Sequence, residues 1–358
     1  MKVIGIIGTA KNTGKTTTLQ CLLEEAVKDN DLKIGVTSIG YDGEWIDSIT
    51  GLPKPRLYVQ EDTYIATASQ CLEKSSCAVK KLVTTDILTP LGPVVIAQVE
   101  KEGLLMTAGP NKSSDVKELI ALMKKFDCDI FFIDGALNRV IPFGASDAIV
   151  VATGAAKNQN ITQLALETKN LVNVLTYDFE MDNEDFDYHK EGICIFSRDQ
   201  KPIQLSFSSL LTREHSDALI KTVNSSTAVI YIPGALLWDP LTCLVKGVPQ
   251  SNQKKTIVLP HNLTLVLSGD LKKTMEAVDM WSDKGFSWKV VHKINLLGIT
   301  LNPFYPSYRP NNNQYSSMYV CAGELNREMS RILSVPLFDL KSDGCEKLWE
   351  SILTMNKG

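Results

Sequence analysis

A glycine-containing turn near the N-terminus constrains the fold of this chain more than any other feature. The turn, Gly8–Thr16, reads GTAKNTGKT; it follows an apolar run at Val3–Ile7 and precedes apolar residues at helical spacing. This order predicts a cradle for nucleotide phosphates, because backbone N–H groups and the helix N-terminus bind phosphate oxygens. We expect Lys15 to neutralise the outer phosphates and the Thr16 hydroxyl to help hold Mg²⁺.

The match to the standard phosphate-binding pattern is incomplete. That pattern has a glycine five residues before Gly14, where this chain has Thr9, and Gly8 stands one place early. An ordinary strand–turn–helix is the alternative interpretation, and the dedicated chemical use of Gly-Lys-Thr favours the phosphate cradle. The residues expected to contact nucleotide are Thr9, Ala10, Lys11, Asn12, Thr13, Gly14, Lys15, Thr16 and Thr17.

Length, composition and charge limit the class of protein. The 358 residues, 44% of them hydrophobic, suffice for one large α/β domain or two smaller ones. The net charge of −4 argues against nonspecific nucleic-acid binding. Eight scattered cysteines without a Cys-x-x-Cys pair indicate reduced thiols rather than a zinc or iron–sulfur site. The first apolar run is too short for a signal peptide or a membrane span, so we expect a soluble, cytoplasmic protein.

Short apolar runs alternate with amphipathic segments along much of the chain. Residues 33–39, 130–133 and 148–152 are expected to form strands, and residues 61–72 and 114–126 are expected to form helices. Continuous apolar runs bounded by turn residues are typical of parallel strands that are covered on both faces. The pattern therefore predicts an α/β fold with a doubly wound, mostly parallel sheet.

The alternation of apolar runs and amphipathic segments is interrupted near residue 180. The acidic run 178–191 is typical of a solvated loop, and strand-like runs return at 263–267 and 294–301. A separate C-terminal domain starting near 180 is the competing interpretation. The preferred organisation is a nucleotide-binding core at 1–179, an insertion of unknown role at 180–255 and a C-terminal completion of the core at 256–358.

Acidic residues follow two of the expected strands, where a doubly wound sheet opens its crevice. Asp134 ends the run 130–133, and Asp42 and Glu44 follow the second strand. Carboxylates there suit Mg²⁺ and the positioning of an attacking group; simple turn residues are the alternative. Asn302 ends a late strand and is expected to contact the base. The expected catalytic residues are Lys15, Asp134 and Asp42, and the expected metal ligands are Thr16, Asp42, Glu44 and Asp134.

Three other polar residues near these motifs have less definite roles. Lys11 either adds positive charge to the phosphates, across a dimer interface, or is an exposed lysine at a loop tip. Asn138 and Arg139 follow the Asp134 strand, where a substrate or a partner would be within reach.

The chain has no Asn-Lys-x-Asp guanine signature, which favours ATP over GTP.

Four stretches together resemble the dethiobiotin synthetase and MobB branch of P-loop NTPases. They are Gly8–Thr18, Asp42–Glu44, Ile133–Ala136 and Ser146–Val151. That branch usually has Glu where this chain has Asp134, and the resemblance covers residues 1–175 well and 260–340 loosely. It implies a P-loop NTPase fold with ATP or GTP and Mg²⁺ as cofactors, and related folds often pair as homodimers across the nucleotide face.

The N-terminal third is more narrowly similar to the small P-loop subunits of lysine 5,6-aminomutase reactivases, the KamB-like family. Val3–Leu19, Thr37–Pro55 and Thr107–Pro110 carry this similarity. It implies a protein that works with a larger ATPase subunit to restore an adenosylcobalamin-dependent aminomutase.

Three functions remain open at this point. The leading one is an accessory protein that uses Mg-nucleotide binding or hydrolysis to change the segments after Asp42 and Asp134 and so remodel a client enzyme. The second is a stand-alone ligase-type enzyme like dethiobiotin synthetase. The third is a nucleotide-binding module without turnover. None of these functions calls for nucleic acid or membrane.

Overall fold

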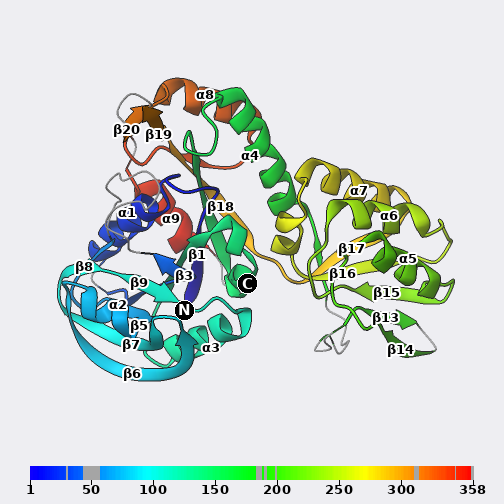
Figure 1. Cartoon of the computed structure of the whole chain (residues 1–358), viewed down its shortest axis with the longest axis horizontal. Helices are drawn as coiled ribbons and strands as arrows, with labels where there is room; N and C mark the ends of the chain where they lie inside the picture. The colour runs from blue at the N-terminus through cyan, green and yellow to red at the C-terminus, as the bar shows by residue number, and fades with distance from the viewer. Residues whose placement is uncertain are drawn as a thin grey trace. The chain divides into compact units, whose positions relative to one another are not determined.

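The computed structural model describes residues 1–29, 31–42, 57–182, 188, 192–197, 200–309, 314–342 and 344–355. The chain forms two compact units, and Figure 1 traces both from the N-terminus in blue to the C-terminus in red. The first unit comprises Met1–Lys169 and Asn295–Gly358, and the second comprises Asn170–Ile294. Each unit combines a mixed sheet with helices, so the α/β class expected from the sequence is confirmed.

The first unit contains a nine-stranded sheet of order β21-β18-β11-β1-β10-β2-β5-β7-β6. Neighbouring strands from β21 to β5 are parallel, and β7 and β6 extend the sheet by antiparallel pairing. The carboxyl ends of β2, β10, β1, β11 and β18 therefore lie along one edge. The strands are Lys2–Gly8 (β1), Ile34–Ser38 (β2), Tyr64–Ala68 (β5), Ala78–Thr89 (β6), Gly92–Lys101 (β7), Ile130–Ala136 (β10), Ala148–Gly154 (β11), Asn295–Asn302 (β18) and Leu337–Phe338 (β21).

The core of the first unit lies between this sheet and its helices. Ile4 of β1, Phe132 of β10 and Val150 of β11 are fully buried, as expected for parallel strands that are covered on both faces. They share one apolar cluster with Leu19 and Leu22, which recur at helical spacing on the buried face of α1. Full burial of each such side chain stabilises the fold by roughly 1.5–3 kcal/mol.

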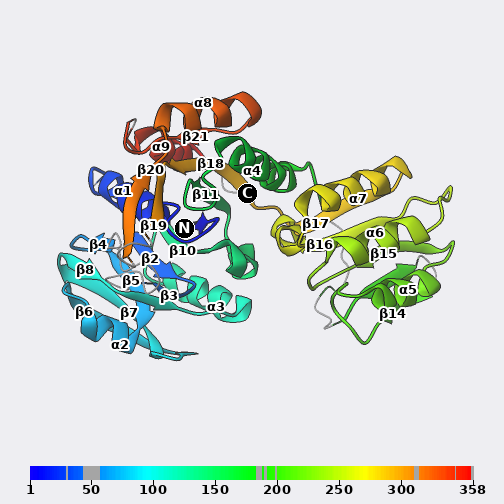
Figure 2. The same ribbon diagram turned by 45° about the horizontal axis from the view of Figure 1, so that its top comes forward.

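Six helices and two 3₁₀ turns accompany this sheet in the part of the chain that the structure describes. Helices α8 and α9 lie beside β21 and β18, as Figure 2 shows. The helix α4 begins in the first unit and crosses into the second. The bounds are Lys15–Val27 (α1), Ser69–Lys74 (α2), Ser113–Lys124 (α3), Ile161–Thr176 (α4), Ala322–Ile332 (α8), Glu346–Thr354 (α9), Leu137–Arg139 (η1) and Ile141–Ala145 (η2).

One of the two predicted helices is present in the structure, and the other is largely a strand. The helix expected at 114–126 is confirmed as α3, whose apolar residues face the core. The helix expected at 61–72 is wrong, because its first half forms β5 and only its second half begins α2. Strand β5 lies between β2 and β7, and that pairing on both sides overrides the local helical pattern.

Three two-stranded ribbons belong to the first unit. One ribbon joins β3 to β9 by antiparallel pairing and lies directly after β2. A second joins β4 to β8, and a third joins β19 to β20 directly after β18. Their strands are Gly40–Asp42 (β3), Leu57–Val59 (β4), Gly103–Leu105 (β8), Thr107–Gly109 (β9), Phe304–Arg309 (β19) and Gln314–Tyr319 (β20).

The second unit has a six-stranded sheet of order β12-β17-β16-β15-β13-β14. The neighbouring strands β12, β17, β16 and β15 are parallel to one another. Strand β13 pairs antiparallel with β15 and with the edge strand β14. The strands are Glu180–Met181 (β12), Cys194–Ser197 (β13), Gln200–Gln204 (β14), Thr227–Tyr231 (β15), Thr256–His261 (β16) and Ser287–His292 (β17). The helices are Arg213–Thr222 (α5), Trp238–Gly247 (α6), Leu271–Asp283 (α7) and the 3₁₀ helix Asn262–Leu267 (η3).

The second unit is wider than the insertion of 180–255 expected from the sequence. Residues 256–292 were expected to complete the first sheet, but they contribute β16 and β17 to the second sheet through parallel pairing with β15. The strand expected at 263–267 is the 3₁₀ helix η3. The chain returns to the first sheet at β18, which coincides with the strand expected at 294–301. An apolar run alone does not specify which sheet it joins.

No helix in the described part of the chain is long and apolar enough to cross a bilayer.

Candidate phosphate-binding site

The loop between β1 and α1 has the backbone geometry of an anion cradle. Asn12 and Gly14 both have positive φ, 64° and 95°, so the chain turns sharply into α1. Gly14 is the N-cap of α1, and no described side chain caps this helix end. The first turn also contains no acidic residue. Helix ends of this kind, with amide N–H groups at the first turn and no acidic residue beside them, are the ones that bind phosphate in other proteins.

Contacts to the neighbouring strands hold the loop in place. The Thr9 amide donates to the Ala152 carbonyl at 3.0 Å, and the Thr13 hydroxyl donates to the Ala10 carbonyl at 2.9 Å. The Thr18 hydroxyl lies 2.8 Å from the Thr300 hydroxyl of β18. These contacts fix the loop in the turn that the sequence predicts for Thr9–Thr17.

Lys15 and Asp134 meet at the centre of the site. Lys15 Nζ lies 2.6 Å from Asp134 Oδ2, and the two side chains are 15% and 6% exposed. The sequence placed Lys15 in the loop and Asp134 at the end of a neighbouring strand, and the structure brings them together. Because both side chains are largely shielded from water, removing either partner would leave the charge of the other poorly solvated.

The expected acids after the second strand are described only in part. The backbone of Asp42 ends β3, where it pairs with Thr107 of β9. The Asp42 side chain and the whole of Glu44 lie outside the described residues. The Ser38 hydroxyl donates to the Gly40 carbonyl at 2.8 Å, which tightens the corner between β2 and β3. The backbone of β3 thus starts at the same sheet edge as Asp134.

Asn302 lies against the phosphate loop, at the end of β18. Its Nδ2 donates to the Asn12 carbonyl at 3.0 Å, and its Oδ1 accepts from the Phe304 amide at 3.2 Å. The expected contact of Asn302 with the base stays a prediction. The two hydrogen bonds join the loop to the ribbon that begins at Phe304.

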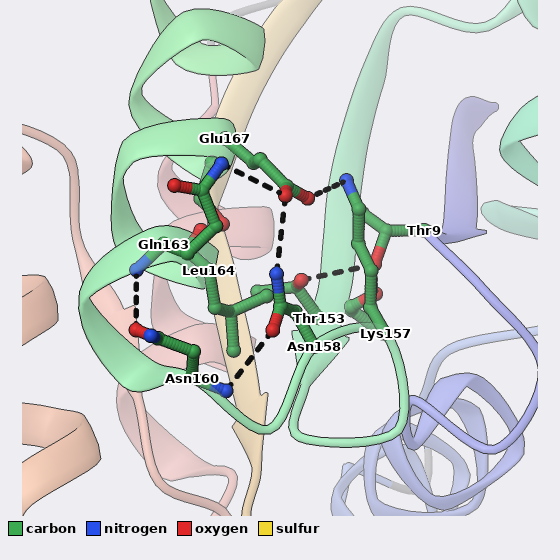
Figure 3. Close-up of polar contacts among 10 residues, drawn as sticks. Thr9, Thr153, Lys157, Asn158, Asn160, Gln163, Leu164 and Glu167 are labelled. Carbon is green, nitrogen blue, oxygen red and sulfur yellow. Dashed lines mark hydrogen bonds and ion pairs between the residues drawn. The ribbon is translucent and has the colours of Figure 1, made fainter.

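A polar network holds the connection between β11 and α4 beside the start of the loop (Figure 3). Thr9 Oγ1 donates to Thr153 Oγ1 at 2.9 Å. The Glu167 carboxylate on α4 accepts from Asn158 Nδ2 at 3.2 Å and lies 3.5 Å from Lys157 Nζ. Sequence reasoning missed this network, because its members are polar residues of a kind common in any loop.

Lys11, Asn138 and Arg139 are exposed. Lys11 lies at the tip of the loop, in agreement with either of its two expected roles. Arg139 folds back to the β2 strand end, where its Nη1 donates to the Ile39 carbonyl at 3.3 Å. This contact links residues 100 positions apart, so no local pattern in the sequence signals it.

The donor set at this edge is suited to Mg²⁺. Thr16 lies in the first turn of α1, next to Lys15 in the chain, and the carboxylate of Asp134 contacts Lys15. Mg²⁺ prefers such oxygen ligands and takes its others from phosphates and water. Among the described residues, no three His, Cys, Asp or Glu side chains form a metal-binding cluster.

Searches against protein-family models, curated proteins and solved structures find no match to this chain. Its function is therefore inferred from the sequence motifs and from the geometry of this site.

Proposed function

We propose that the first unit is a P-loop NTPase with a doubly wound core that binds ATP, in preference to GTP, together with Mg²⁺. The observation that carries this proposal is the buried pair of Lys15 and Asp134 beside the uncapped start of α1. A nucleotide tail in the loop receives amide N–H groups from α1 and the ammonium of Lys15. Asn302, bonded to the loop at Asn12, lies next to the base.

The protein side chains supply the groups that hold the metal and the phosphates. Thr16 and Asp134 would provide oxygen atoms for Mg²⁺, and the sequence offers Asp42 and Glu44 as further ligands. When bound, Mg²⁺ neutralises charge on the outer phosphates. Asp134 is the group at this edge that holds Lys15 in place before nucleotide arrives.

We propose that this nucleotide site drives an accessory protein, which reactivates an adenosylcobalamin-dependent aminomutase with a larger ATPase subunit. Two of the stretches with KamB-like similarity are in contact, since β3 of Thr37–Pro55 pairs with β9 of Thr107–Pro110, and the third stretch, Val3–Leu19, contains the loop. β9 packs so closely on β2 that a Cβ at Gly109 would overlap the Ser38 carbonyl. A change at the outer phosphates is therefore expected to reach β3 through β2, with the buried strand β9 as its support, and to alter how a client binds.

Calorimetry with Mg-ATP and Mg-GTP tests nucleotide binding. Lys15→Ala is expected to abolish binding, because the loop loses its charge partner for the outer phosphates. Lys28→Ala is the matched control: Lys28 follows the far end of the same helix, where it pairs with Glu25 at 2.8 Å. Wild-type affinity in Lys15→Ala would refute the site.

Reconstitution tests the accessory role. Inactivated aminomutase holoenzyme is mixed with this chain, the larger ATPase subunit and Mg-ATP, and mutase activity is followed. Recovery that needs both proteins and disappears with Lys15→Ala supports the proposal. Turnover that requires a small carboxylate or amine substrate, with no client, supports the ligase-type alternative instead. Binding without any turnover supports the third alternative, a nucleotide-binding module.

A further inference from the structure

We infer that Arg139 contacts the terminal phosphate of the bound nucleotide and makes the site select triphosphate over diphosphate. This inference rests on the proposed nucleotide site and assigns one residue within it. The guanidinium of Arg139 lies at the carboxyl end of β2, two strands from the phosphate loop in the order β1-β10-β2.

A continuous chain of contacts leads from the loop to this guanidinium. Lys15 Nζ lies 2.6 Å from Asp134 Oδ2, the Ile39 amide donates to the Asp134 carbonyl at 2.6 Å, and Arg139 Nη1 donates to the Ile39 carbonyl at 3.3 Å. Lys15 reaches the outer phosphates in such loops. Arg139 thus lies at the same edge of the sheet as the pair of Lys15 and Asp134, and we place the terminal phosphate on this side of Lys15.

The corner between β2 and β3 is shaped to admit the guanidinium. Gly40 has a φ of 74°, and a Cβ at this position would overlap Arg139 Nη1 and lie 2.9 Å from Asn111 Oδ1. A residue with a side chain would push Arg139 away, so glycine serves both the turn and the close approach of the cation. The Arg139 guanidinium is thus held against the backbone of Ile39 and Gly40, although the residue is exposed.

The charge distribution favours Arg139 as the cation for an added phosphate. Lys15 is already balanced by Asp134 at 2.6 Å. Among the described residues, no carboxylate lies within ion-pair distance of Arg139, and the Ile39 carbonyl accepts its one hydrogen bond. A guanidinium presents several N–H groups in a planar fork that matches phosphate oxygens. A triphosphate adds negative charge at this end of the site, whereas a diphosphate does not reach it.

Calorimetry with Mg-ADP and Mg-AMP-PNP tests the inference. Arg139→Ala is expected to weaken AMP-PNP binding about 10- to 100-fold, as for loss of a charge-assisted hydrogen bond, and to change ADP binding less than about twofold. Arg139→Gln keeps an N–H donor for Ile39 without the charge, and it is expected to show the same selective loss. Arg331→Ala, which removes an exposed arginine paired with Glu328 on α8, is the control and binds both nucleotides as wild type.

The outcomes separate this inference from the proposed function. If the wild type binds both nucleotides and Lys15→Ala, shown to be folded by circular dichroism, binds neither, the phosphate site stands. An unchanged ratio of AMP-PNP to ADP affinity in both Arg139 variants then overturns the role of Arg139 alone. If the wild type binds no nucleotide, the proposed site and this inference fall together. If Arg139→Ala does not fold, as judged by circular dichroism, the ratio in Arg139→Gln decides.

Discussion

The pair of Lys15 and Asp134 allows a quantitative test of the first unit without any nucleotide. The perturbations are Lys15→Met, Asp134→Asn and the double variant. Met fills much of the volume of the lysine stem, and Asn keeps the shape of the carboxylate, so each change removes mainly charge. The double-variant cycle then isolates the coupling between the two groups.

The separation and burial of the pair set the expected magnitude. At 2.6 Å and an effective dielectric constant of about 20, the Coulomb attraction is about 6 kcal/mol, and desolvation of both ions offsets much of it. Removing one partner leaves the other charge buried, so each single variant should lower the free energy of unfolding by about 3–5 kcal/mol. The double variant should lose less than the sum, by roughly 2–3 kcal/mol.

Cys128 provides an assay that reports the first unit alone. It is 3% exposed, and burial raises the pKa of its thiol to about 12, so iodoacetamide modifies it only after unfolding. Mass spectrometry of the Cys128 peptide across a urea series therefore yields the free energy of unfolding of this unit. Losses below about 1 kcal/mol in both single variants, with additive effects in the double variant, would refute the reasoning.

Two further predictions concern packing and pH. Gly154→Ala should lower the free energy of unfolding by about 1–3 kcal/mol in the Cys128 assay, because a Cβ would overlap the Asn302 carbonyl on β18. The control is Gly323→Ala on α8, which has open space around it and should leave the free energy of unfolding unchanged. Burial raises the pKa of Tyr231 to about 12, above its ordinary 10.0, so its stabilising effect is complete below pH 10 and is lost as pH rises toward 12. Between pH 9 and 11 the wild type should lose about 1.4 kcal/mol more than Tyr231→Phe in urea unfolding, and equal losses would contradict this.

The features that the sequence predicted well are contiguous in the chain. The loop Thr9–Thr17 carries its turn, its lysine and its helix start within nine residues, so its fold depends on local chemistry. The helix α3 has a regular apolar stripe, and β10 has a continuous apolar run. In each case the pattern of burial and the local backbone preference agree.

The features that the sequence did not reveal depend on distant partners. β5 was expected to be helical, and it is a strand because β2 and β7 pair with it from both sides. The Thr9–Thr153 and Arg139–Ile39 contacts join residues 144 and 100 positions apart. The second unit also includes residues 256–292, which the sequence assigns to the core, because β16 and β17 join the sheet that contains β15.

The contact between Asn302 and Asn12 can form only late in synthesis of the nascent chain. The residues are 290 positions apart, and the whole second unit is synthesised between them. At roughly 5–20 residues per second, the ribosome delivers β18 about 15–60 s after the glycine turn. Throughout that interval the nascent protein lacks the strand whose Asn302 contacts the β1–α1 loop, so the candidate phosphate-binding site is completed only after the second unit has been translated.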